Sequence, residues 1–310
     1  MVELHVWGND GEISVISPEC IASAWLLSMK KLPDLVIVTS NNTNFSDIGQ
    51  LPVLIDGEKK YNGYKQICRY IDNVAGNTGS QTDQLLDSSL ISLLLEKFEV
   101  LNQYNLYVNS QNYEKFTRKL FQNYLPFPMM YNQPLKYYNY ARDQVKLLGL
   151  GPSKTGFFSF SSNEPVAMTE TLNDDIEDEE NEQVALSGLH ERQLLRKAKE
   201  KGVIQESKNS LRCLNLIHHY LEQILDIYKT NEPVKRTNHR VLLIAYMACF
   251  NYGKLPDGFI GRYLNEKYGD LVKELENEKQ TLTYTTRPAT SYESPSLINE
   301  VKYVAGLVKY

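Results

Sequence analysis

The feature that most constrains the fold is the stretch of residues 50–64. Residues 53–55 form a short apolar run after a proline, and the run ends at Asp56-Gly57. Asp-Gly is a strong signal for a two-residue β-hairpin turn, because the turn types that suit paired strands need positive φ angles. Residues 60–62 can then pair back on the first strand, and a helical pattern begins after Gly63. The stretch therefore predicts strand, tight turn, strand and helix in close succession.

The residues before this stretch complete a small α/β unit. Residues 4–7 favour a first strand, and residues 35–38 are a continuous apolar run, as is typical of a strand covered on both faces. Between them, Ser17 is expected to cap a helix that begins with Pro18. The order βαβ followed by ββα predicts a thioredoxin-like N-terminal domain over residues 1–75, and residues 76–82 are predicted to be a linker.

From residue 83 onward the periodicity is helical. Residues 83–151 and 185–280 are predicted to be two parts of an all-α C-terminal domain, and a thioredoxin-like domain followed by such a domain resembles the architecture of glutathione transferases. The ten-residue apolar run 241–250, which Thr237 is expected to cap, is predicted to be its buried centre. Residues 152–184 lose the periodicity and are predicted to be an acidic disordered insertion. Residues 281–310 are predicted to be a linker, over 281–296, and a C-terminal amphipathic helix.

Composition excludes several classes of function. The net charge is −5, and residues 170–182 hold eight acids without a Lys or Arg, so the remainder is slightly basic. This balance argues against a general nucleic-acid binder. The longest uncharged apolar run is far shorter than the roughly 20 residues that span a bilayer, so we expect no transmembrane helix. The N-terminus does not resemble a signal peptide, so we do not expect one. Four widely spaced cysteines fit reduced thiols in a cytosolic setting.

Residues that could carry chemistry are sparse. A thioredoxin-like fold places its reactive group at the start of the first helix, where this chain offers only Ser17 and Cys20. We interpret Ser17 as a helix cap and Cys20 as a small buried residue. Glutathione transferases also need a Glu/Gln-Ser pair at the start of the helix after the hairpin, and Gly63-Tyr64 stands there instead. The histidines lack ligand spacing. We therefore predict no catalytic residue, no cofactor and no metal.

Two segments have faces suited to protein contacts. One is a basic half-helix at residues 192–201, for which a solvated charged face is the alternative interpretation. The other is the C-terminal helix, which is too short to fold alone and must pack on its own domain or on a partner. The candidates for partner contacts are Arg192, Arg196 and Lys197 in the first segment and Leu297, Val301, Val304 and Val308 in the second.

Several motifs, in this order and spacing, resemble the metaxin family. They are most similar to the larger fungal metaxin-like subunits of the mitochondrial outer-membrane sorting and assembly machinery. The resemblance also implies a cis bond before Pro52, where glutathione-transferase-like proteins carry a cis-proline, while Gly57 is expected to form the turn. The matching motifs are residues 4–11, 38–43, 51–55 with Gly63-Tyr64, 112–121, 127–135 and 255–258.

The resemblance implies a transferase-like fold without the enzyme activity. It implies a place on the cytosolic face of the mitochondrial outer membrane, held peripherally at the membrane surface or by partners. The implied partners are an outer-membrane β-barrel assembly protein, a second metaxin-like subunit and a receptor of the general import translocase. The implied role is to support insertion and release of β-barrel precursors. The alternatives are a glutathione-dependent transferase that uses Ser17 or Cys20, and a transferase-like scaffold module of a translation complex.

Overall fold

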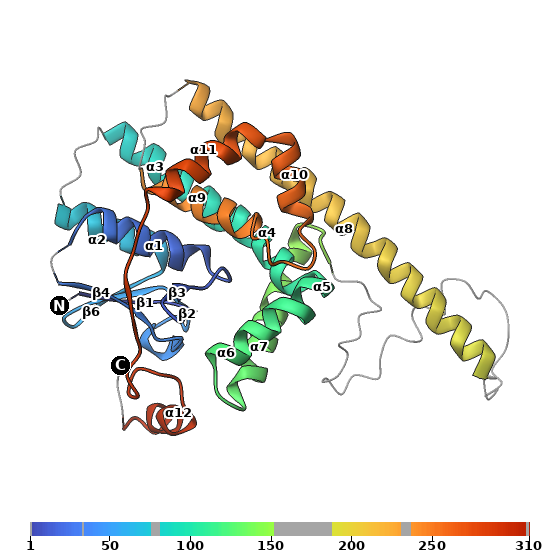
Figure 1. The fold of residues 1–310 in the computed structure, drawn as a ribbon, viewed down its shortest axis with the longest axis horizontal. Helices are drawn as coiled ribbons and strands as arrows, with labels where there is room; N and C mark the ends of the chain where they lie inside the picture. Colours follow the sequence, from blue (N-terminus) through green and yellow to red (C-terminus); the bar gives the residue numbers. More distant parts are fainter. Residues whose placement is uncertain (1, 33, 76–80, 152–187, 231–236, 308–309) are drawn as a thin grey trace.

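The computed structural model describes residues 2–32, 34–75, 81–151, 188–230, 237–307 and 310. A small α/β domain lies beside a larger helical domain, and one long helix extends away from both (Figure 1). The predicted thioredoxin-like and all-α parts of the fold are thereby confirmed. The predicted acidic insertion over residues 152–184 lies outside the described residues.

The sheet of the α/β domain has the strand order β6-β5-β1-β4-β7. The first strand pairs in parallel with β4 and antiparallel with β5, and β5 and β6 form the hairpin that turns at Gly57, which has a φ of 61°. Positive φ is what the Asp-Gly signal requires at this place. The strands are β1 (Val2–His5), β4 (Leu35–Thr39), β5 (Val53–Asp56), β6 (Lys59–Asn62) and β7 (Thr286–Pro288).

Two helices, α1 (Pro18–Met29) and α2 (Gly63–Ala75), cover one face of this sheet (Figure 1). The Ser17 side chain accepts a hydrogen bond from the Cys20 N–H at 3.3 Å, which makes Ser17 the cap that the sequence predicts. A short hairpin of β2 (Gly8–Asn9) and β3 (Glu12–Ile13) joins β1 to α1.

The helical domain is built around α9 (Asn238–Phe250), in which every residue except Ala248 is buried. This helix packs against α1, α3 and α11, so its apolar character on all sides matches its surroundings. The other helices are α3 (Gln81–Leu93), α4 (Glu99–Gln103), α5 (Ser110–Asn112), α6 (Arg118–Tyr124), α7 (Met129–Leu147), α8 (Gly188–Thr230), α10 (Phe259–Lys267), α11 (Gly269–Gln280) and α12 (Leu297–Val304). Single π-helical turns lie at Leu94–Phe98, Tyr104–Val108 and Tyr113–Thr117, and a 3₁₀ turn at Thr43–Phe45.

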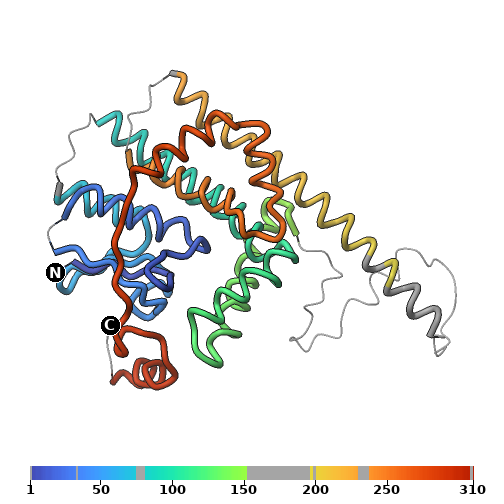
Figure 2. The backbone as a smooth tube through the Cα atoms, in the orientation of Figure 1, coloured from blue at the N-terminus to red at the C-terminus, as the bar shows by residue number. Residues whose placement is uncertain are grey.

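The C-terminal segment differs from the expected linker over 281–296. After α11 the chain crosses the α/β domain (Figure 2), and β7 adds a fifth strand to the sheet in parallel with β4. The guanidinium of Arg287 then pairs with Glu293 at 2.7 Å and with Glu3 at 3.1 Å. The hydrogen bonds from Arg287 and from the Thr290 N–H and hydroxyl hold the pKa of Glu293 down at about 2. Three residues that end in a proline are too short for alternation to reveal a strand, because the pairing partner is far away in the sequence.

Candidate functional site

The start of α1 is where a thioredoxin-like fold would carry its reactive group. The Ser17 hydroxyl oxygen is engaged as the helix cap. Cys20 is fully buried, and this burial raises the pKa of its thiol to about 12. A thiol with such a pKa is not ionised at neutral pH, and the thiolate is the nucleophilic form. Neither side chain is therefore arranged to attack a substrate.

The start of α2 holds a carboxylate that the chain itself provides. The Glu19 Oε2 atom accepts a hydrogen bond from the Tyr64 N–H at 2.9 Å. Free N–H groups at a helix N-terminus favour an anion, and in the resembled transferases this place receives the charged end of glutathione. Gly63 has a φ of 73°, a conformation that glycine adopts readily, and it turns the chain into this helix. Burial raises the pKa of Glu19. The place where the transferases bind the charged end of glutathione is therefore occupied by the Glu19 side chain of this protein.

The ring of Tyr64 fills the space beside this carboxylate. The side chain is fully buried, and its hydroxyl donates a hydrogen bond to the carbonyl oxygen of Asn238 at 2.7 Å. Asn238 is the first residue of α9, so Tyr64 connects the α/β domain to the centre of the helical domain. The Leu51–Pro52 bond is cis, and the Pro52 carbonyl accepts a hydrogen bond from Gly63 N–H at 2.9 Å. This bond extends the β5–β6 pairing by one residue and fixes Pro52 against the start of α2.

A second carboxyl group, that of Glu99, faces the same junction from α4. The hydroxyl of Tyr246 donates to its Oε2 at 3.0 Å, and the amide nitrogen of Gln103 donates to its Oε1 at 3.3 Å. Loss of hydration and the neighbouring Glu19 together raise the pKa of Glu99 to about 8. Sequence patterns did not single out Glu19 as a ligand mimic or Glu99 at all, because each acquires its surroundings from segments distant in the chain.

Glu99→Gln is expected to make the protein less sensitive to pH. In the unfolded chain Glu99 ionises near pH 4.5, whereas in the folded protein it keeps its proton until about pH 8. The folded state therefore binds more protons across this window, and the free energy of unfolding falls as the pH rises through it. Glutamine is neutral throughout, so the variant should gain stability relative to the parent between pH 5 and pH 8, by about 4 kcal/mol at the upper end. Urea unfolding at a series of pH values measures this difference.

Glu96→Gln is the matched control for Glu99→Gln. Glu96 lies one helical turn earlier and is exposed, so its replacement should leave the pH profile of stability unchanged. Parallel profiles for the parent and Glu99→Gln would contradict the assignment of a neutral carboxyl at position 99.

The N-terminus of α9 is capped from another helix. Thr237 occupies the cap position, as the sequence predicts, but its hydroxyl makes no capping bond. Instead the Asp87 carboxylate on α3 accepts the His239 N–H at 2.9 Å and also contacts its Nδ1. A carboxylate at a helix N-terminus stabilises the helix dipole from any chain position. The local pattern identified the site of the cap but missed the residue that provides it.

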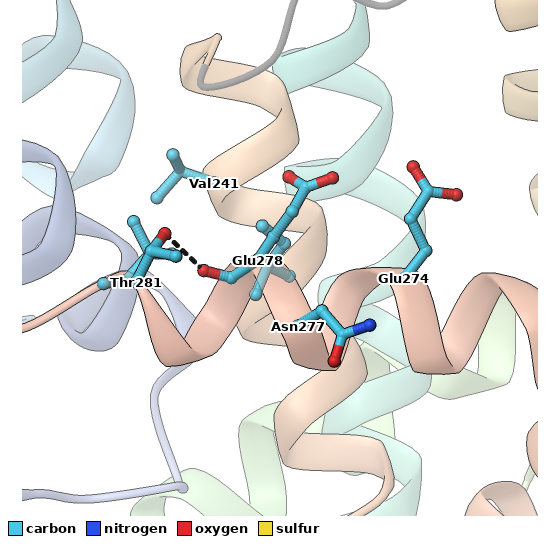
Figure 3. A pocket seen from close by; sticks show the side chains of 7 residues that line it. Val241, Glu274, Asn277, Glu278 and Thr281 are labelled. Carbon is cyan, nitrogen blue, oxygen red and sulfur yellow. Dashed lines mark hydrogen bonds between the residues drawn. The ribbon is translucent and has the colours of Figure 1, made fainter.

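A cavity of about 380 Å³ lies between α9 and α11 (Figure 3). Its carboxylates belong to an ion cluster around Arg240, which is almost completely buried. The Arg240 Nη2 atom lies 2.6 Å from Glu274 Oε1 and 2.7 Å from Glu278 Oε1. Because Arg240 already pairs with these carboxylates, we assign the cluster a structural role. The cavity is lined by Val241, Ile244, Glu274, Asn277, Glu278, Thr281 and Leu282.

The predicted contact residues lie on separate surfaces. On α8, Arg196 and Lys197 are exposed, and Arg196 pairs with Glu200 one turn later at 3.0 Å. The side chain of Arg192 and all of Val308 lie outside the described residues. On α12, three of the residues predicted to contact a partner are exposed: Leu297, Val301 and Val304.

The described residues include neither a cluster of metal ligands nor a helix that could span a membrane. Nowhere in these ranges do three or more His, Cys, Asp or Glu side chains gather as metal ligands would. Within the same part of the chain, each helix is too short or too polar to cross a bilayer. The four cysteines are free and buried.

Comparison with known families gives two matches along the chain. Residues 20–138 match the family model described as outer mitochondrial membrane transport complex protein. Residues 169–308 match the model of the Tom37 C-terminal domain. Together the two matched ranges cover most of the chain, and they include residues of both the α/β domain and the helical domain.

One curated relative agrees with this assignment. The chain is 27% identical to the metaxin-1 homolog of Drosophila melanogaster over 148 residues, which are 47% of this chain and 45% of that protein. The chain thus spans about half the length of this relative. The human glutathione S-transferase T1-1 in its apo form aligns over 80% of this chain and 99% of its own, with 14% identity and a TM-score of 0.30. From the two family matches and the metaxin relative, we conclude that the chain belongs to the metaxin family and is a Tom37-like protein.

Proposed function

We propose that this protein is a non-enzymatic subunit of the sorting and assembly machinery of the mitochondrial outer membrane. In this role it lies on the cytosolic face and supports insertion and release of β-barrel precursors. Its partners are the β-barrel assembly protein, a second metaxin-like subunit and a receptor of the general import translocase. Family membership supports the outer-membrane complex, and the finer roles are part of the proposal.

The observation that carries the non-enzymatic part is the filled junction between the two domains. A glutathione enzyme needs an open position at the start of α2 and a reactive group at the start of α1. Here Glu19 accepts the Tyr64 N–H, and the buried Tyr64 ring stands beside it. The buried Cys20 thiol has a pKa of about 12. These contacts fill the junction between the two domains. The outer surfaces of the protein are therefore the places where partners would bind.

Affinity purification of the full chain from mitochondria, followed by mass spectrometry, tests the proposal. We expect a β-barrel membrane protein and a second metaxin-like subunit to co-purify with it. We expect the purified chain to pass over immobilised glutathione without retention. Retention that is lost in Cys20→Ala would favour the transferase alternative, and co-purification with translation factors alone would favour the translation scaffold.

Reversing the charge of the basic half-helix tests the translocase contact. The triple change Arg192→Glu, Arg196→Glu and Lys197→Glu should weaken binding to an acidic receptor segment by about fivefold or more at low ionic strength, because several attractions become repulsions. Added salt should reduce the difference, since it screens exposed charges. Pull-down at two ionic strengths measures both effects.

Lys229→Glu is the control, because Lys229 is exposed at the opposite end of the same helix. Its reversal should leave receptor binding unchanged. Equal binding by the triple variant and the parent at low salt would remove the basic half-helix from the interface.

A further inference from the structure

Helix α12 is fastened to the protein by its polar side. The Asn299 amide nitrogen donates to the carbonyl oxygens of Ser291 and Ser294, both at 2.9 Å. One position later, Glu300 Oε2 accepts a hydrogen bond from the Asn44 side chain at 2.7 Å, which ties the helix to the α/β domain. The Ser296 hydroxyl caps its N-terminus through the Asn299 N–H at 3.1 Å. The orientation of the helix is therefore set by specific bonds.

The opposite side of α12 is apolar and faces outward. Residues 297, 301 and 304 share one face at helical spacing, with Ile298 at one edge and Glu300 at the other, while Asn299 lies on the opposite side. No residue of α12 is buried. This is the reverse of a helix on a globular protein, whose apolar face packs on the core. The outward aliphatic side chains, between 50% and 78% exposed, are Leu297, Ile298, Val301 and Val304, with Leu307 just beyond the helix.

The types of residue around this apolar face match those found at successive depths of a membrane–water interface. Tyr303 and Tyr292 are partly exposed, and the ring of each packs at a tilted angle against that of Tyr310. Tyrosine rings favour the headgroup level, with aliphatic side chains deeper and a charged residue such as the exposed Lys302 at the water side. In Figure 1, α12 lies at the edge of the molecule, away from α8 to α11.

A second copy of the chain fits this face less well than lipid. A stable, specific dimer needs about 800 Å² buried on each partner, and the side chains of one eight-residue helix cannot supply that area alone. Acyl chains need no such area, because each aliphatic side chain that leaves water contributes independently. The family match to an outer mitochondrial membrane complex supplies a lipid surface near the protein.

We infer that α12 is a lipid-contact helix, whose outward aliphatic face inserts into the interfacial layer of a bilayer while its polar side stays bonded to the protein. The inference rests on the membrane location in the proposed function. The contact is driven by burial of aliphatic surface rather than by anionic headgroups. One short helix gives weak, reversible attachment, which would orient a protein already held by its partners.

Vesicle flotation of the purified full chain tests the inference. The protein should float with phosphatidylcholine vesicles, and high salt should not release it. The change of Ile298, Val301 and Val304 to asparagine should reduce partitioning about tenfold or more, because three aliphatic side chains no longer leave water. The control variant, Leu147→Asn with Val203→Asn, removes exposed aliphatic side chains from α7 and α8 and should float like the parent. Thermal unfolding checks that both variants fold.

A tryptophan probe locates the contact. Val301→Trp should shift to shorter emission wavelengths with vesicles and be quenched by brominated acyl chains, whereas Leu147→Trp should not. Flotation of the asparagine variant like the parent, or binding that needs anionic lipid and is lost in high salt, would overturn the inference. So would a Val301→Trp signal that changes with protein concentration and not with lipid, which would indicate a second copy. Partner co-purification is measured separately, so its loss or survival tests the proposed function and not this helix.

Discussion

Tyr64→Ala is expected to lower the free energy of unfolding by about 4 kcal/mol, the largest loss from a single substitution in the junction between the domains. The ring is fully buried, so its removal leaves a cavity that packed neighbours refill only in part. The Asn238 carbonyl also loses the hydroxyl that donates to it at 2.7 Å. Chemical denaturation followed by circular dichroism measures the change.

Tyr64→Phe separates the two causes. It keeps the ring and removes only the hydroxyl, so it should cost about 1–2 kcal/mol, the range for leaving one buried acceptor without its donor. A cost for Tyr64→Ala below that of Tyr64→Phe would show that the ring does not fill the junction. Neither variant is expected to bind glutathione, because Glu19 still occupies the start of α2.

Arg240→Met is expected to destabilise the protein by about 3 kcal/mol. The guanidinium is almost completely buried, and it pairs with Glu278 and Glu274 on α11. Removing one member of a buried ion pair costs about 3–5 kcal/mol, because the remaining charge has lost its partner. The lower end applies here, since the Glu274 side chain is more than half exposed and water can solvate it. Thermal and urea unfolding measure the loss.

A second substitution shows whether the stranded carboxylate is the cause. Arg240→Met combined with Glu278→Gln removes the buried negative charge together with its partner, so part of the lost stability should return. Glu276→Gln, on the same helix, is the control and should restore nothing. If the double variant is no more stable than Arg240→Met alone, the cost comes from the lost contact of the guanidinium with the face of the Tyr228 ring, whose centroid lies 5.6 Å away.

The sequence predicted the order of elements because local patterns determine them. The Asp56-Gly57 turn, the cap at Ser17 and the long apolar run of α9 each work through residues a few positions apart. Such short-range signals identify strands, helices and their starts. The residue types at the starts of α1 and α2 are also readable directly, and the expectation of a non-enzymatic protein rests on them.

Short-range patterns could not predict which side chains fill the junction between the two domains. Glu19 could be recognised as a first-turn acid, yet nothing local indicates that its carboxylate bonds to the start of a different helix 45 residues later. The same holds for Asp87, which caps α9 across 152 residues. These contacts exist only once the sheet and helices are assembled.

By itself, the sequence determined the two-part fold and the amphipathic pattern of the last helix. Only the tertiary structure decided that the anion position is filled by Glu19 and Tyr64, that β7 completes the sheet, and which way α12 faces. A helical pattern gives the relative angles of side chains but no outward direction. The hydrogen bond between Asn44 and Glu300, which spans 256 residues, fixes which side of α12 faces the protein. Such long-range pairings depend on the assembled fold.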